Sequence, residues 1–86
     1  MTHDAIIAGL TQFIARELLE GDDAGLTPDT PLIELGVISS MSIVLLSGFI
    51  EQEYGVVVPQ RDMTVSNLAT LDRVAALIGR LAAARG

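Results

Sequence analysis

Three serines stand just before an almost wholly apolar segment, and their hydroxyls are the groups of this sequence best placed for chemistry. Ser39, Ser40 and Ser42 lie between Gly36, which permits a tight turn, and the apolar run 43–46. If a helix begins here, Ser39 suits the N-cap, and its replacement by alanine is expected to cost about 1 kcal/mol. Ser40 is then the first helical residue, where free N–H groups and the helix dipole favour a phosphate. A serine pair at a helix start also serves plain capping, so the pattern indicates a candidate site.

The remaining inventory of reactive side chains is small. The chain has no cysteine and one histidine, His3, near an end that is expected to fray. No thiol nucleophile, disulfide or cysteine-ligated metal is available, and no nucleophile–base pair can be placed. The acidic residues that follow the first helix lack the ligand spacing of an EF-hand and are interpreted as solvated charge; they are Asp22, Asp23, Asp29 and Glu34. We expect neither a catalytic residue nor a metal site.

The segment after the serines predicts a helix with two apolar stripes. At about 100° per residue, one side carries Ile43, Leu46, Ile50 and Tyr54. The opposite side carries Met41, Val44, Leu45 and Gly48. A helix in a small bundle normally buries one stripe, and a second stripe left on the surface indicates a contact site. The pattern equally allows a central helix packed on both sides, a homodimer seam, or a Leu45 buried beneath the preceding loop.

Amphipathic helices are predicted towards both ends of the chain. The first spans 2–19, with Thr2 as its cap and Asp4 in its first turn. Its apolar residues are Ile6, Ile7, Leu10, Phe13, Ile14 and Leu18. The last helix follows Thr70 as its cap, and its apolar face consists of Leu71, Val74, Leu77, Ile78 and Leu81. Arg80 and Arg85 suit its C-terminal end, and the tail 82–86 is expected to fray.

The segments between the three predicted long helices contain no further long amphipathic pattern. The connection 20–38 is long, and its apolar residues can pack it against the core; they are Leu26, Leu32, Ile33 and Leu35. Residues 56–58 have strand-forming side chains, but no second strand is available to pair with them. A loop with a short helical turn at 64–68 precedes the last helix. The pattern therefore predicts an all-α fold.

Size and charge limit the class of protein. Eighty-six residues make one domain, 1–86, and half of them are hydrophobic with few aromatics, which favours helix packing. The net charge of −6 argues against nucleic acid or an anionic membrane as partner, because both are bound through basic surface. No basic leader and no segment long enough to cross a bilayer is present. We expect a cytoplasmic protein that docks on basic patches of other proteins.

The residues around the serines resemble a known motif. Leu-Gly-Val-Ile-Ser-Ser-Met at 35–41 is similar to the phosphopantetheine attachment site of acyl and peptidyl carrier proteins, which reads Leu-Gly, one or two residues, then Asp-Ser-Leu. Ser39 takes the place of the aspartate and Met41 that of the leucine. With Ser40 as the attachment residue, the family's core positions fall on Leu46, Ile50 and Tyr54. If Ser39 were the attachment residue, the alignment with the family motif would shift by one residue and every later match would be lost.

This resemblance implies a free-standing carrier, 1–86, with the four-helix bundle of acyl carrier proteins: three long helices, a short third helix and a long first loop. In such proteins a phosphopantetheinyl transferase moves the 4′-phosphopantetheine arm from coenzyme A to the serine, here Ser40, and the thiol of the arm holds an acyl or aminoacyl group as a thioester. The implied partners are the transferase, a loading enzyme and downstream synthase or tailoring enzymes in polyketide, nonribosomal-peptide or related secondary metabolism. The carrier is not itself an enzyme, and a monomer is expected.

Docking is expected to be more apolar than is usual for this family. Its members often place acidic residues directly after the serine–leucine pair and one turn later, where Ser42 and Leu45 stand here. The expected docking face is formed by Met41, Ser42, Val44, Leu45, Gly48, Glu51 and Gln52. An alternative is an arm-less helical interaction or dimerisation domain that uses the stripe of Met41, Val44 and Leu45.

Overall fold

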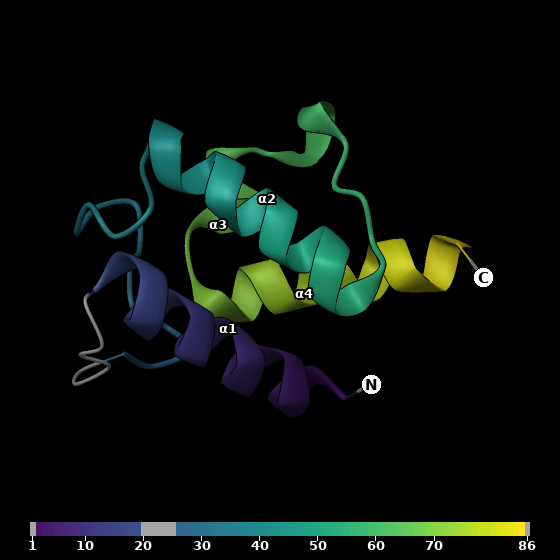
Figure 1. Ribbon diagram of the computed structural model, residues 1–86, viewed down its shortest axis with the longest axis horizontal. Coiled ribbons are helices and arrows are strands. Elements are labelled where there is room, and N and C mark those ends of the chain that lie inside the picture. The colour runs from purple at the N-terminus through teal and green to yellow at the C-terminus, as the bar shows by residue number, and fades with distance from the viewer. Residues whose placement is uncertain (1, 20–25, 86) are drawn as a thin grey trace.

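The computed structural model describes residues 2–19 and 26–85, and helices dominate this part of the chain (Figure 1). The elements in order are α1 His3–Leu18, α2 Ser40–Tyr54, the short 3-10 helix η1 Gln60–Asp62, α3 Val65–Leu68 and α4 Leu71–Arg85. No strand occurs within the described ranges. The predicted all-α bundle with a short third helix is therefore confirmed, and residues 56–58 pair with no strand there.

Two details differ from the sequence-based expectation. η1 is not predicted; it forms directly after Pro59, whose fixed φ suits a helical start, and Asp62 N donates to Pro59 O at 2.9 Å. α4 is helical as far as Arg85, although fraying is expected after Leu81. Leu81 and Ala82, at the start of this stretch, pack against the core.

α4 is the element that the other helices share. It lies behind and between α1 and α2 in Figure 1, and it contacts α1, α2 and α3. Its buried side chains, none more than 2% exposed, are Leu71, Val74, Ala75, Leu77 and Ile78. They meet side chains from α1 and α2, among them Ile6, Leu10, Phe13, Ile14, Leu46 and Ile50. The core is thus built mainly of aliphatic side chains, as the composition predicts.

The described part of the first connection, 26–39, is fastened to the start of α4. Leu32 N donates to Ala69 O at 2.8 Å, and Asp72 N donates to Pro28 O at 3.0 Å. Both bonds join the connection to the residues on either side of the α4 N-terminus. The chain therefore enters α2 from a fixed point on the bundle.

Apolar side chains of this connection pack it against the core, with one exception. Leu32 and Ile38 are buried, and Leu26 and Ile33 are half-buried, as expected. Leu35 was expected to join them, but it is 64% exposed. Leu32 and Ile38 fill the core on either side of the turn, and Leu35 is left outside it.

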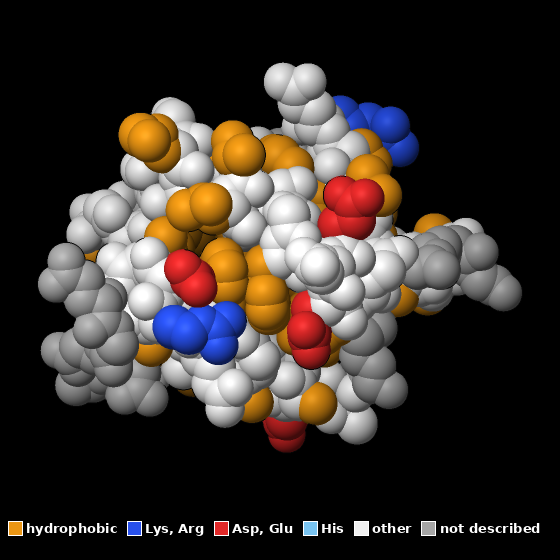
Figure 2. All heavy atoms as spheres, in the orientation of Figure 1, with side chains coloured by type: hydrophobic (Ala, Val, Ile, Leu, Met, Phe, Trp, Pro, Cys, Tyr) orange, Lys and Arg blue, Asp and Glu red, His pale blue; other side chains and the backbone are white. Residues whose placement is uncertain are grey.

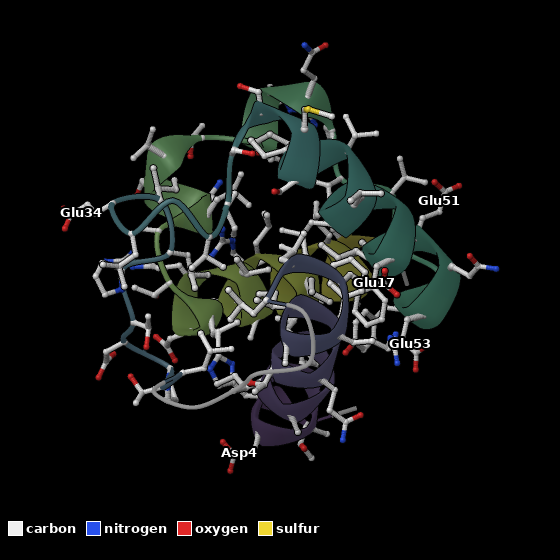
Figure 3. All side chains as sticks on the ribbon, turned by 60° about the vertical axis from the view of Figure 1, so that its left-hand side comes forward. Asp4, Glu17, Glu34, Glu51 and Glu53 are labelled. Atoms are coloured by element: carbon white, nitrogen blue, oxygen red, sulfur yellow. The ribbon has the colours of Figure 1, made fainter. Side chains whose placement is uncertain are left out.

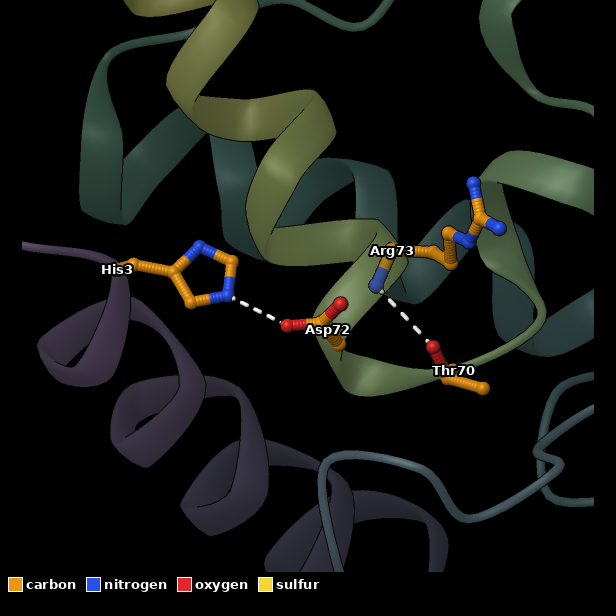
Figure 4. A network of polar contacts seen from close by, with 4 residues as sticks. All are labelled: His3, Thr70, Asp72 and Arg73. Carbon is orange, nitrogen blue, oxygen red and sulfur yellow. Dashed lines mark hydrogen bonds and ion pairs between the residues drawn. The ribbon is translucent and has the colours of Figure 1, made fainter.

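Predicted caps are found at two helix starts. Thr2 Oγ1 accepts a first-turn N–H of α1 at 3.1 Å, and Thr70 Oγ1 accepts the N–H of Arg73 at 3.1 Å (Figure 4). His3, which was expected on a frayed end, opens α1 and places Nε2 2.8 Å from Asp72 Oδ1. This contact links the beginning of α1 to the beginning of α4.

Aromatic side chains join α1 to α2. Phe13 stacks on Phe49 with ring centroids 4.3 Å apart, and Phe49 meets Tyr54 edge-on at 5.9 Å. The Tyr54 hydroxyl donates to Ile6 O at 3.4 Å. Partial burial raises the pKa of Tyr54, and the negative charge of Glu53 adds to the effect. The hydroxyl therefore stays protonated and keeps its role as a donor.

Gly9 of α1 leaves room for the Tyr54 hydroxyl, and a pair of substitutions tests this fit. A Cβ at Gly9 would stand 2.5 Å from Tyr54 Oη. Alanine is favoured over glycine by about 1 kcal/mol in a helix interior, yet we expect Gly9→Ala to lower the free energy of unfolding because of this clash. In a Tyr54→Phe background the same substitution should raise it. Urea unfolding measures both values, and an equal effect in the two backgrounds would contradict the close fit.

Candidate functional site

The start of α2 presents Ser40 to solvent. Gly36 has φ 75°, a left-handed conformation that glycine adopts without strain, and Ile38 is buried just after this turn. Ser39 has extended backbone at the N-cap position, and its carbonyl accepts the N–H of Ile43 at 2.9 Å. Ser40 is the first helical residue, as predicted, and it is exposed.

The capping bond expected from the Ser39 side chain is absent. Ser39 Oγ makes no capping bond to a backbone N–H and lies 3.2 Å from Ser42 Oγ. Residues three apart are neighbours on a helix surface, so these two hydroxyls can satisfy each other and compete with the cap. Ser39 thus holds the N-cap position through its backbone, and the expected stability contribution of its hydroxyl has to be corrected downwards.

The electrostatic setting of this helix end favours an anion. The first-turn N–H groups of an α-helix have no acceptor within the helix and carry the positive end of its dipole. The first turn of α2 contains no acidic side chain, and the Ser39 hydroxyl does not occupy these donors. A phosphate attached to the Ser40 oxygen would lie beside them. The residues present therefore fit a group linked through a phosphodiester.

α2 separates into a buried face and an exposed face. Leu46 and Ile50 are at most 2% exposed and belong to the hydrophobic core, and half-buried Ile43 and Tyr54 pack against that core. The opposite stripe is open: Met41 is 83%, Val44 71% and Leu45 54% exposed. Among the described residues, therefore, the preceding connection does not cover Leu45, and this stripe of α2 stays open.

Acidic side chains gather away from the start of α2. Glu51 and Gln52, both expected in the docking face, are exposed in the second half of the helix. Figure 3 shows Glu17, Glu51 and Glu53 on the side where α1 and α2 meet, while Glu34 lies at another edge of the molecule. Ser40 is thus followed first by apolar surface and then by acidic surface.

The interior behind α2 is closely filled. An apolar pocket of about 10 Å³ lies between α2, α3 and α4. Its lining includes Ile43, Leu46, Met63 and Leu68. A space of this size accepts about one water-sized sphere. An acyl chain has no room there without a rearrangement of these side chains.

Two further findings concern the described residues alone. They contain no cluster of three side chains able to hold a metal ion, and no helix among them is long and apolar enough to cross a membrane. Asp29 and Glu34 of the acidic connection are exposed, which agrees with solvated charge. Asp22 and Asp23 lie outside the described residues.

A helical bundle that offers an accessible serine as the first residue of a long helix fits a class of protein that carries a covalently attached group. Comparisons agree with this class. The family model for the phosphopantetheine attachment site matches residues 9–78. The chain is 36% identical over 74 residues to the probable acyl carrier protein PigG of Serratia sp. (strain ATCC 39006), and the match covers 86% of this chain and 85% of PigG.

A solved structure is also similar. It is described as "Crystal structure of FAD-dependent dehydrogenase", and the matching chain has a TM-score of 0.76 and 42% sequence identity. The match covers 80% of this chain and 97% of that chain. The protein therefore belongs to the family of acyl and peptidyl carrier proteins. These are non-catalytic carriers of a covalent 4′-phosphopantetheine, which a phosphopantetheinyl transferase attaches.

The structure also brings together residues that the sequence did not group. Phe13 and Arg16 of α1 lie beside Leu45, Phe49 and Glu53 of α2 and line one groove with them. Phe13 belongs to the apolar pattern of α1, so periodicity assigns it to the core. Nothing in the spacing along the chain indicates which side of α2 faces α1.

The hydroxyl of Ser39 is predicted to contribute little to stability. Ser39→Ala removes a contact to another surface hydroxyl and should change the free energy of unfolding by less than about 0.5 kcal/mol. Thr70→Ala removes a true capping bond and should cost about 1 kcal/mol. Chemical unfolding of both variants measures the difference. An equal loss would show that Ser39 caps α2 in solution.

Proposed function

We propose that Ser40 bears the 4′-phosphopantetheine arm and that this chain delivers the tethered group between biosynthetic enzymes. The observation that carries the proposal is the position of Ser40, the exposed first residue of α2 in the register of the family motif. The neighbouring hydroxyls are less suited, because those of Ser39 and Ser42 lie 3.2 Å apart and pair with each other. Ser42 is also half-buried.

Arm transfer needs little chemistry from the carrier. The Ser40 oxygen forms a bond to the pantetheine-side phosphorus of coenzyme A, the bond from that phosphorus to the nucleotide breaks, and adenosine 3′,5′-bisphosphate leaves. The serine proton passes to a base of the transferase. What this chain supplies is an accessible hydroxyl and a helix end whose N–H groups favour the phosphodiester.

The cargo is proposed to be an acyl or aminoacyl group held outside the bundle. The small apolar pocket of about 10 Å³ supports this, because it offers no space to a tethered chain. The setting that fits best is polyketide, nonribosomal-peptide or related secondary metabolism, with the carrier as a cytoplasmic monomer. A loading enzyme and a downstream synthase or tailoring enzyme complete the set of partners.

A flavin enzyme is proposed as one of these tailoring partners. The support is the similar chain at 42% identity whose structure is described as that of an FAD-dependent dehydrogenase. In such a step the carbon next to the thioester carbonyl would lose a proton to a base, and the neighbouring carbon or nitrogen would lose a hydride to the flavin. The cargo gains a double bond, and the two electrons of the hydride reduce FAD.

The attachment site is tested by intact mass after treatment with coenzyme A and a broad-specificity phosphopantetheinyl transferase. Wild-type protein should gain the mass of one arm, and Ser39→Ala and Ser42→Ala should gain it as well. Ser40→Ala should gain nothing. An arm on Ser40→Ala would contradict the assignment, and an unchanged wild-type mass would favour the arm-less interaction domain.

The exposed stripe of α2 is proposed as the docking face, with Met41, Val44 and Leu45 at its centre and Ser42, Gly48, Glu51 and Gln52 around them. Exposed apolar side chains in this number next to a modified residue indicate a contact surface. Loss of the acidic residues that the family often has here should reduce electrostatic steering, which acts mainly on association rate. Apolar burial should supply the affinity instead.

Leu45→Gln, which removes the apolar contact without adding the acidic charge that the family often has here, tests this docking face. Full burial of a leucine side chain contributes roughly 1.5–3 kcal/mol, so we expect the efficiency of arm transfer to fall about tenfold or more. Because Leu45 is 54% exposed, the fold should remain intact, as circular dichroism would show. Val57→Gln makes a similar apolar-to-polar change on a side chain that is 66% exposed outside α2 and serves as the control. Equal transfer to both variants would refute the proposed face.

A further inference from the structure

A groove of about 450 Å³ lies between α1 and α2, next to the exposed stripe. Its floor and walls include Phe13, Val44, Leu45, Gly48 and Phe49. Figure 2 shows apolar side chains in this hollow, with acidic and basic side chains around it. We call this feature the α1–α2 groove.

Gly48 keeps the middle of the α1–α2 groove open. A glycine in a helix interior is less favourable than alanine by about 1 kcal/mol. A Cβ at Gly48 would meet no atom within 4 Å, and the backbone there is ordinary α-helix. Neither the backbone nor packing among the described residues accounts for this glycine. The missing side chain at Gly48 instead leaves space for a side chain of a binding partner.

The rim of the groove carries more acidic than basic side chains. Glu53 and Arg16 line it, and Glu17 and Glu51 lie on the same side of the molecule (Figure 3). Arg16 Nε is already paired with Glu17 Oε1 at 3.2 Å. The surface that complements this groove therefore presents one large apolar side chain flanked by lysine or arginine.

We infer that the α1–α2 groove is a docking site for the phosphopantetheinyl transferase, through a segment of that composition. The inference rests on the proposed function of Ser40. Gly48 lies about 12 Å beyond Ser40 along the axis of α2, at ~1.5 Å per residue. The transferase must bring its active centre to the Ser40 hydroxyl itself, so its surface reaches the groove. Enzymes that act on the distal thiol of the arm do not have to bring their active centre to Ser40, because the arm spans the distance.

Charge favours the same partner. Coenzyme A carries several phosphate groups, and an enzyme that holds it presents lysine and arginine around its site. A basic surface that continues beyond that site meets the carboxylates at the rim of the groove. The apolar floor then receives a side chain that the enzyme places beside these basic residues.

Filling the groove tests the inference by steady-state kinetics of arm transfer with coenzyme A and a broad-specificity transferase. Gly48→Leu should keep its fold, since leucine favours helix and the space is open. Its KM should rise about tenfold with little change in kcat, because Ser40 remains in place. Gly79→Leu is the matched control: Gly79 also lies inside a helix with no atom within 4 Å of a Cβ, and its KM should not change.

Charge reversal at the rim provides the second measurement. Glu53→Arg should lower kcat/KM severalfold at low salt, and the loss should fade as salt screens the contact. Asp4→Arg makes the same change in net charge away from Glu53 (Figure 3) and should have no such effect. An unchanged KM for Gly48→Leu with normal modification of Ser40 would overturn the groove and leave the proposed function standing. Wild-type protein that accepts no arm would overturn both.

Discussion

The burial of α4 against the other three helices is the constraint on which the rest of the structure depends. Its side chains Leu71, Val74, Leu77 and Ile78 are almost completely withdrawn from water. Because α4 takes one apolar stripe of α2, the bundle is complete without the other stripe. The exposed surface beside Ser40 is therefore a consequence of how the core is built, and it can change without loss of the fold.

The same arrangement fixes the place of Ser40, the proposed attachment residue. Ile38 enters the core just before α2, and Leu46 and Ile50 anchor the helix behind it. Ser40 lies between these anchors at the first turn, where no acidic side chain opposes a phosphate. A partner enzyme that reaches Ser40 would thus meet a helix end anchored in the core, and an arm attached there would supply the reach to more distant active sites.

Sequence patterns predicted the helices, the caps at Thr2 and Thr70, and the division of α2 into two faces, because these depend on spacing along one element. They failed where several partners competed for one group. The Ser39 hydroxyl contacts the Ser42 hydroxyl and makes no capping bond to the backbone. Leu32 and Ile38 are buried in the core, whereas Leu35 is exposed. The α1–α2 groove could not be predicted from the sequence either. It depends on how α1 packs against α2 through Phe13 and Phe49, and the pattern of a single helix does not contain this information.

The central claim is that Ser40, and no neighbouring hydroxyl, carries the arm. Fragmentation mass spectrometry of the intact holo-protein locates the added mass between adjacent backbone bonds and so separates the three serines without any substitution. The arm is predicted on the fragment that gains its mass at residue 40. An arm found on residue 39 or 42 would contradict the account, because either result would place the phosphodiester on a hydroxyl that the structure shows engaged elsewhere.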